Sequence, residues 1–288
     1  MIEVHDIWKS YNTTLALRGV SFEVNSADIF GIIGSDGAGK TTLFRILSTL
    51  MLPDNGRAAI EGRDVVKEFG EIRRRIGYMP GRFSLYQDLT VRENLAFYAT
   101  VFRTNVGENY DLIKDIYRYL EPFANRRAGA LSGGMKQKLA LCCSLIHRPS
   151  VLMLDEPTTG VDAVSRKEFW EMLHNLRLQG ITILVSTPYM DEASQCDKIA
   201  LIQNGTILGI DAPNALIASY PNRLYAARAL NNYHLLNEMK KRKDVATCYI
   251  AGAELHVVFK TSESPVLDGV TIYPITPTVE DCFIQLMR

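Results

Sequence analysis

The order of apolar and polar positions predicts an α/β protein built on a parallel sheet. Strand-like runs cover residues 2–8, 17–24 and 28–33, and a glycine-rich loop at 34–42 precedes a segment with helical apolar spacing. Helical and loop segments are expected over roughly 64–147. Strand-like and helix-like segments then alternate, in the order VLMLD, RKEFWEMLHNLRLQ, ITILVS, MDEASQC and KIALIQ. Such alternation is typical of a parallel sheet with helices on its faces.

The pattern changes after about residue 220. The segments NRLYAAR, HLLNEMKKRK, ATCYIAG, ELHVVFK, VTIYPI and VEDCFIQLMR predict a strand, a helix, three strands and a helix. We therefore expect a main domain over 1–219 and a small α+β appendix over 220–288. A basic run, KKRK at 240–243, ends the predicted helix, where cations complement the helix dipole.

Composition narrows the class of protein. Hydrophobic residues make up 47% of the chain, charged residues 22%, and the net charge is +0, which is ordinary for a soluble globular protein. No global charge favours nucleic acid as a partner. No apolar run approaches the roughly 18 residues that span a bilayer. The amphipathic start is unlike a signal peptide, and the five cysteines lack metal-ligand spacing, so we expect a cytoplasmic protein.

The glycine-rich loop, GSDGAGKTT, has the spacing of a phosphate-binding loop between a strand and a helix. Its glycines let backbone N–H groups turn toward phosphates, and the following helix adds partial positive charge. Lys40 is expected to reach the β- and γ-phosphates and Thr41 to hold Mg²⁺. The predicted nucleotide-binding residues of this loop are Gly34, Ser35, Asp36, Gly37, Ala38, Gly39, Lys40, Thr41 and Thr42. The alternative is a glycine-rich turn with a chance Lys-Thr pair.

Two acids end a strand-like apolar run in VLMLDEP. An unpaired buried charge is costly, so acids at this place indicate a function. Asp155 is expected to bind Mg²⁺ opposite Thr41, and Glu156 to orient and polarise the attacking water as the catalytic residue. The alternative is two solvent-facing acids that cap the next helix.

The stretch LSGGMKQKLALCCSLIHRPSVLMLDEPTTGVD resembles the signature and second nucleotide motif of the ATP-binding cassette (ABC) family. The resemblance runs from residue 2 to about residue 220. It implies a phosphate-loop NTPase cassette with a parallel core sheet, an antiparallel β subdomain and a helical subdomain at about 82–148. The cofactors that it implies are ATP and Mg²⁺. Ser132 also suits a helix N-cap that leaves the amides of Gly133 and Gly134 for an anion.

In this family two cassettes pack head to tail, and each signature covers the ATP held by the other chain. The resemblance therefore implies that Ser132 and Gly134 contact the partner's γ-phosphate, supported by Gln137, with Gly133 also among the nucleotide-binding residues. Tyr11, which precedes LALRGVSFEV, would stack on adenine, with core packing as the alternative. Asp162, in TTGVD, would couple the two sites across the interface.

Two positions depart from the family pattern. The family has a glutamine after a stretch like GYMP, where this chain has Gly81, and a histidine after a stretch like ST, where this chain has Pro188. Both missing groups act mainly in hydrolysis, so binding is expected to persist while hydrolysis slows. Alternatively, a neighbouring side chain, Arg82 or Tyr189, compensates for the missing glutamine and histidine.

The tail PTVEDCFIQLMR is similar to those of bacterial drug-export and type-2 export ATPases. The first hypothesis is therefore an exporter subunit on the inner face of the membrane, bound to a permease through a surface that includes Phe83, Leu85 and Tyr86. The second is a catalytically weak subunit that completes the site of a partner cassette, with a heterodimer favoured over a homodimer. A soluble cassette that acts on ribosomes or DNA is the third hypothesis, and it is disfavoured.

Overall fold

A computed structural model describes residues 1–261, 267 and 269–287 of the chain. Contacts divide the chain into two compact units, Met1–Pro213 and Asn214–Leu286. Helix α7 (Pro213–Ala218) begins at this division, whereas the sequence prediction placed the boundary after it, between residues 219 and 220. The limits of the independently folding domains stay a prediction. Residue 288, the last of the predicted C-terminal helix, lies outside the described residues.

A six-stranded sheet forms the centre of the first unit, in the order β10-β9-β3-β8-β7-β6. All neighbours are parallel except the terminal pair β10–β9, which is an antiparallel hairpin. Every residue of β3, β7 and β8 is buried, which explains why these strands are continuous apolar runs. The strands are β3 (Ile29–Ile33), β6 (Ile76–Met79), β7 (Val151–Asp155), β8 (Thr182–Thr187), β9 (Lys198–Gln203) and β10 (Thr206–Asp211).

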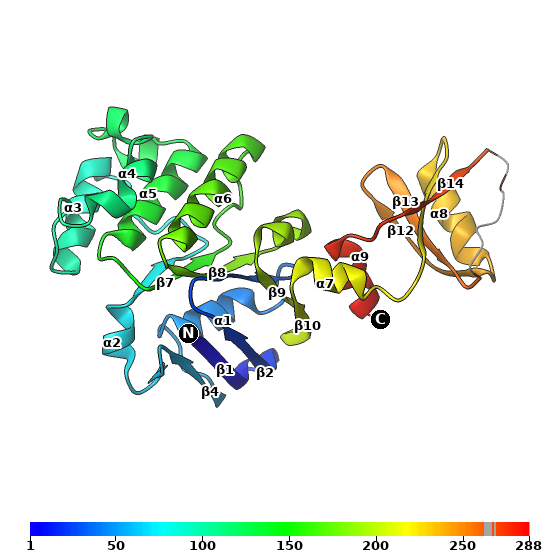
Figure 1. The fold of residues 1–288 in the computed structure, drawn as a ribbon, viewed down its shortest axis with the longest axis horizontal. Coiled ribbons are helices and arrows are strands. Elements are labelled where there is room, and N and C mark those ends of the chain that lie inside the picture. The colour runs from blue at the N-terminus through cyan, green and yellow to red at the C-terminus, as the bar shows by residue number, and fades with distance from the viewer. Residues whose placement is uncertain (262–266, 268, 288) are drawn as a thin grey trace. The chain divides into compact units, whose positions relative to one another are not determined.

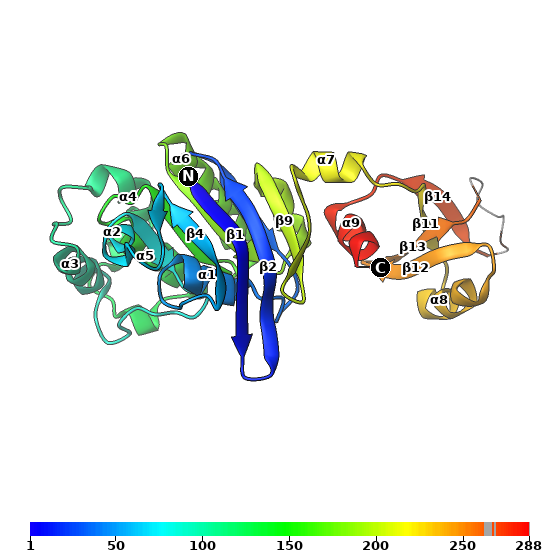
Figure 2. The same ribbon diagram turned by 90° about the horizontal axis from the view of Figure 1, so that it is seen from below.

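A second, antiparallel sheet has the order β2-β1-β4-β5. Its strands are β1 (Ile2–Tyr11), β2 (Thr14–Val24), β4 (Asn55–Ile60) and β5 (Arg63–Asp64). Figure 2 shows β1 and β2 side by side as a long hairpin. The sequence pattern predicted no strand over β4. It also missed β5, at the edge of the region predicted as helices and loops, and β6, within that region. Strands β5 and β6 have two and four residues, which is too short for a period-2 pattern to register.

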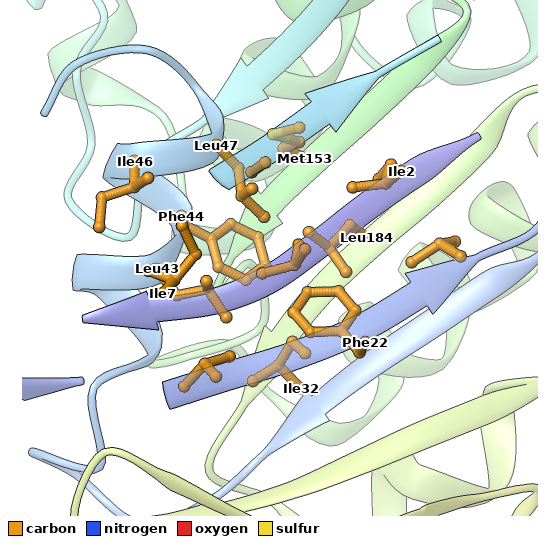
Figure 3. Packing of buried hydrophobic residues seen from close by; sticks show 14 of the residues in the cluster. Ile2, Ile7, Phe22, Ile32, Leu43, Phe44, Ile46, Leu47, Met153 and Leu184 are labelled. Carbon is orange, nitrogen blue, oxygen red and sulfur yellow. The ribbon is translucent and has the colours of Figure 1, made fainter. Parts of the chain in front are cut away.

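The main core lies between the two sheets and the helix that follows the glycine-rich loop, α1 (Lys40–Leu47). Figure 3 shows Ile2 and Phe22 from the antiparallel sheet facing Phe44 of α1 and Leu184 of β8. The rings of Phe22 and Phe30 stack with centroids 5.3 Å apart. This packing fixes α1, and with it the loop at its start, against the carboxyl ends of the parallel strands.

The remaining α-helices described in the first unit are α2 (Phe69–Arg73), α3 (Val91–Val101), α4 (Tyr110–Tyr117), α5 (Gly133–Leu145) and α6 (Ala163–Leu178). Its described 3₁₀ helices are η1 (Glu121–Phe123), η2 (Ala128–Ala130) and η3 (Met190–Gln195). Helices α3, α4 and α5 fall within the predicted helical subdomain, and α5 packs against both of the others. Figure 1 shows the three grouped together. Helix α3 begins with a capping box formed by Thr90 and Glu93.

The second unit has its own sheet, in the order β12-β13-β11-β14, with every pair antiparallel. Its elements are β11 (Leu224–Arg228), α8 (Asn232–Lys241), β12 (Val245–Ala251), β13 (Glu254–Phe259), β14 (Thr271–Ile275) and α9 (Val279–Leu286). This is the predicted order of strand, helix, three strands and helix. Among the described residues of both units, no helix combines the length and apolar character needed to cross a membrane.

Candidate functional site

The glycine-rich loop joins β3 to α1 and wraps around the side chain of Lys40. The Lys40 ammonium donates to the carbonyl oxygens of Gly34 at 2.8 Å and Ser35 at 3.0 Å, and the side chain is only 3% exposed. Gly37 and Gly39 have φ angles of 77° and 108°, in the left-handed region that favours glycine. The loop backbone therefore curls around the buried ammonium group of Lys40.

Two glycines of the loop allow its backbone to approach neighbouring strands closely. A Cβ on Gly34 would clash with the carbonyl oxygen of Ile202 in β9, and one on Gly39 would lie 2.6 Å from the carbonyl oxygen of Ala16 in β2. A Cβ on Gly37 would meet open space, so glycine is favoured there by its φ angle alone. The loop is thus anchored at both ends and open in its middle.

The remaining predicted loop residues have mixed roles. Ser35 donates its hydroxyl to Gln203 at 2.7 Å, and the carbonyl oxygen of Ala38 accepts the amide of Gly205 at 2.9 Å. Asp36 is exposed. A hollow of about 140 Å³ lies at the loop, and its lining residues are Ala16, Gly37, Gly39, Lys40, Thr41, Thr42 and Glu156. The sequence motif is therefore a concave site with a cation at its base.

Asp155 ends β7 and is 1% exposed, so it is not the solvent-facing acid of the alternative interpretation. The hydroxyl of Ser186, its neighbour across to β8, donates to Asp155 Oδ1 at 2.7 Å. A single donor leaves much of the hydrogen-bonding capacity of this buried carboxylate unused, because carboxylate oxygens can accept several hydrogen bonds. Asp155 and Thr41 line the same hollow, and carboxylate and hydroxyl oxygens are ligands suited to Mg²⁺.

Glu156 faces the glycine-rich loop. Its backbone has a φ of 52°, and its amide donates to the carbonyl oxygen of Ser186 at 3.1 Å and to the Ser186 hydroxyl at 3.0 Å. Its carboxylate Oε1 lies 3.0 Å from Lys40 Nζ. The structure thus brings together the two side chains predicted to hold the phosphates and the attacking water.

A second, larger hollow of about 730 Å³ lies beside the first. Its lining residues are Thr41, Arg45, Leu50, Tyr78, Pro80, Gly81, Arg82, Ser84, Asp155 and Glu156. Thr41 and Glu156 line both hollows. Burial, and then the charge of Asp155, raises the pKa of Tyr78 to about 12, so the Tyr78 hydroxyl in this hollow stays protonated at neutral pH. A group bound in the loop would project its far end toward Asp155, Glu156 and the second hollow.

Tyr11 lies at the end of β1 and is 40% exposed. Its hydroxyl is 3.4 Å from Thr42 Oγ1 and donates to the sulfur of Met51 at 3.1 Å. The ring therefore stands next to the start of α1 and is accessible, which disfavours the alternative of core packing. Its predicted contact with adenine remains a prediction.

The signature residues line neither hollow of this chain. Ser132 caps α5 and accepts the amide of Met135 at 3.4 Å, as predicted for a helix start. A Cβ on Gly134 would lie 2.7 Å from Ser165 Oγ at the start of α6, and one on Gly133 would lie 3.5 Å from the carbonyl oxygen of Gly160. Gln137 follows on α5 and is half-buried. The amides at this helix start thus belong to a surface separate from the phosphate-loop hollows.

Asp162 caps α6, accepting the amides of Val164 at 3.1 Å and Ser165 at 3.0 Å. These hydrogen bonds, that from Ser165 above all, lower the pKa of the Asp162 carboxyl below its ordinary value. The residue therefore has a local structural role that the sequence prediction did not include. Any contact across an interface would be additional.

The two side chains proposed as compensation lie in different places. The ring of Tyr189 is covered by the Arg166 guanidinium, whose carbon lies 4.6 Å from the ring centroid. Arg82 lines the second hollow with Asp155 and Glu156. The sequence did not predict the hydrogen bond that Ser186 donates to Asp155. A polar residue near the end of the strand ITILVS was the available signal for Ser186, but its partner depends on strand order.

The fold and this site together define a phosphate-loop NTPase, and comparisons with known proteins agree. The family model described as "ABC transporter" matches residues 17–159. The chain is 41% identical over 286 residues to the probable multidrug ABC transporter ATP-binding protein YbhF of Escherichia coli strain K12, covering 94% of this chain and 49% of that protein. It is 32% identical over 296 residues to the Nod factor export ATP-binding protein I of Rhizobium sp. strain N33, covering 99% of this chain and 96% of that one.

Among solved structures, the dimeric structure of MJ0796, a bacterial ABC transporter cassette, matches with a TM-score of 0.66 and 25% identity, over 74% of this chain and 98% of that chain. The chain belongs to the ABC transporter family of ATP-binding proteins. It spans about half the length of the YbhF relative that it matches.

Proposed function

We propose that this chain binds Mg·ATP in its own phosphate loop and serves as the ATP-binding subunit of an ABC exporter. The observation that carries the proposal is the Lys40–Glu156 pair, 3.0 Å apart, beside the buried carboxylate of Asp155. These groups bracket the place where a γ-phosphate would lie. The export assignment is supported by the relatives, whose names refer to multidrug transport and Nod factor export.

Each group at the site has a chemical task in this proposal. Lys40 and the loop amides bind the phosphates, and Thr41 and Asp155 hold the Mg²⁺ that arrives with ATP. Glu156 positions water for attack on the γ-phosphorus. Tyr11 stacks on adenine, since its ring is accessible beside Thr42.

Hydrolysis in this chain's own site is proposed to be slow. Gly81 and Pro188 provide no side-chain donor at the positions where the family has glutamine and histidine. Removing one preorganised donor typically costs a factor of about 10²–10³ in rate, and losses within one catalytic unit are not additive. Binding depends on other groups, which are all present, so tight binding with slow turnover follows.

The proposed partners are a second ABC cassette and a membrane permease. The signature around Ser132 lies outside this chain's own hollows and is available to a partner's nucleotide, and the related MJ0796 cassette forms a dimer. A partner whose site hydrolyses ATP efficiently would compensate for slow hydrolysis in this chain's own site, so a heterodimer is favoured. No nucleic-acid partner is proposed, because the net charge is +0.

An apolar hollow of about 360 Å³ is the proposed permease contact. It lies between β6, α3 and α5, and Leu85, Tyr98 and Phe102 are among its lining residues. Of the three side chains predicted to face the permease, Leu85 is buried at 7% exposed, whereas Tyr86 is 51% exposed. Phe83 is half-buried beneath Lys136. Through this contact the subunit would lie on the inner face of the membrane.

Equilibrium titration with Mg·ATP tests the proposal. We predict that Lys40→Ala weakens binding by at least about tenfold, because it removes the cation aimed at the phosphates and its bonds to Gly34 and Ser35. Lys67→Ala, an exposed lysine outside the hollows, is the matched control and should bind like the parent. Unaltered affinity of a folded Lys40→Ala variant would show that the phosphate-loop assignment is wrong.

A further inference from the structure

We propose that the Arg82 guanidinium contacts the γ-phosphate of ATP bound in this chain and supports the slow hydrolysis that remains. The inference rests on the proposed function of the phosphate loop. It assigns to one residue the stabilisation of negative charge that Gly81 and Pro188 cannot provide.

The position of Arg82 carries the inference. Arg82 lines the second hollow together with Thr41, Asp155 and Glu156, the groups assigned to Mg²⁺ and the attacking water. The preceding residue, Gly81, lies against the backbone of Asp155, since a Cβ there would be 3.0 Å from the Asp155 carbonyl oxygen. The backbone at Gly81 therefore lies next to the end of β7, which carries Asp155, and Arg82 is the residue that follows. Because Gly81 has no side chain, nothing from that residue fills the space between Arg82 and the carboxylates.

The guanidinium of Arg82 is also uncommitted. In the described part of the chain, no hydrogen bond or ion pair holds this side chain, and it is exposed. Two other cations near the strand ends are engaged, Lys40 with Glu156 and Arg166 with Asp191 and the Tyr189 ring. Tyr189 is therefore held by Arg166, which leaves Arg82 as the better placed of the two compensating residues. Among the described residues, the side chain of Arg45 in the same hollow is as uncommitted as that of Arg82.

A second arginine, Arg45, lines the same hollow and serves as an internal comparison. It lies in the last turn of α1, one helical turn beyond Thr41, so it is about 6 Å farther along the helix from the loop. Arg82, in contrast, follows the residue that touches Asp155. Two arginines in one hollow thus differ in their expected distance from the reacting phosphate.

The chemistry suits an arginine. As water attacks, its oxygen bonds to the γ-phosphorus while the bond from that phosphorus to the β–γ bridging oxygen breaks. The water proton passes to Glu156, and ADP leaves with the electron pair of the broken bond. Negative charge is then spread over the γ-oxygens, to which a guanidinium presents several N–H donors in a fixed plane. An arginine in this role contributes more to the transition state than to ground-state binding.

The test compares Arg82→Ala, Arg82→Lys and Arg45→Ala in the full chain. We expect Arg82→Ala to lower kcat by about 10²-fold while its Kd for Mg·ATP changes less than about threefold. Its affinity for ADP·vanadate, a transition-state mimic, should fall in parallel with kcat. Arg82→Lys should retain part of the activity, added guanidinium should partly restore Arg82→Ala, and Arg45→Ala should behave like the parent.

Unfolding of the variants, followed by the fluorescence of Trp8 and Trp170, separates a local effect from a loss of structure. Arg82→Ala with parental kcat and parental vanadate affinity overturns the inference while leaving the proposed function intact. An equal loss of kcat in Arg45→Ala also overturns it, because any positive charge in the hollow would then support hydrolysis equally well. A parent chain that does not bind Mg·ATP overturns the inference and the proposed function together.

Discussion

At the scale of single residues, the site depends on close approaches that only some side chains permit. Gly34 illustrates this, because its backbone lies against the carbonyl oxygen of Ile202 in the neighbouring strand β9. Lys40 then draws the loop inward by donating to the carbonyl oxygens of Gly34 and Ser35. A substitution at Gly34 therefore acts on the sheet as well as on the loop.

We predict that Gly34→Ala lowers the free energy of unfolding of the first unit by about 1–3 kcal/mol, the usual cost of forcing an atom into a packed site. Gly70→Ala is the control, since a Cβ at this exposed position in α2 meets open space and should leave stability unchanged or raise it by about 0.4–1 kcal/mol. Denaturant unfolding followed by tryptophan fluorescence measures both, because the two tryptophans, Trp8 and Trp170, lie in this unit. Gly34→Ala that unfolds at the parental denaturant concentration would contradict the packing argument.

At the scale of elements, the sequence predicted most strands and helices and the position of the phosphate loop. Strong signals made this possible: continuous apolar runs for buried strands, and a glycine spacing that no ordinary turn requires. The short strands β5 and β6 escaped because too few residues were available to show a period. Ser186 escaped because its bond to Asp155 exists only once β8 lies next to β7, and strand order is not a local property.

The second unit is held by a buried carboxylate at the start of α9. Asp281 is 1% exposed and its Oδ1 lies 2.6 Å from Tyr249 Oη and 2.6 Å from His256 Nδ1. Its Oδ2 accepts the amide of Thr278 at 2.6 Å. Burial raises the pKa of Asp281, but these hydrogen bonds outweigh burial and lower it below the ordinary value of 3.8. The charged form therefore stabilises the unit at neutral pH.

We predict that Asp281→Asn loosens α9 at pH 7, seen as faster amide hydrogen exchange in residues 279–286 and unchanged exchange in α6. Glu280→Gln, an exposed neighbour in the same helical turn, is the control for loss of charge near the helix start. Because the pKa of Asp281 is lowered by folding, its contribution is fully present above pH 3.8 and is lost as pH falls through the lower folded value. Equal exchange in the parent and Asp281→Asn at pH 7 would contradict this role.

At the scale of the whole molecule, the positions of the nucleotide-binding and signature residues favour ATP sites that two cassettes share. The phosphate loop, Asp155 and Glu156 meet at one set of hollows, while the signature at Ser132 belongs to another surface. In the proposed function, one chain would bind a nucleotide in one place and offer its signature groups in another. With Gly81 and Pro188 in its own site, the chain is proposed to retain ATP and to lend its signature to a partner that turns over faster.

The most direct test of this account is the steady-state ATPase rate of the purified parent chain beside that of a Gly81→Gln, Pro188→His double variant. The glutamine requires a shift of a few tenths of an ångström at the Asp155 carbonyl oxygen, 3.0 Å from the added Cβ. We predict that both proteins bind Mg·ATP, that the parent turns over well below about one per second, and that the double variant is at least about tenfold faster. A parent that already hydrolyses several ATP molecules per second, with no gain in the double variant, would contradict the account.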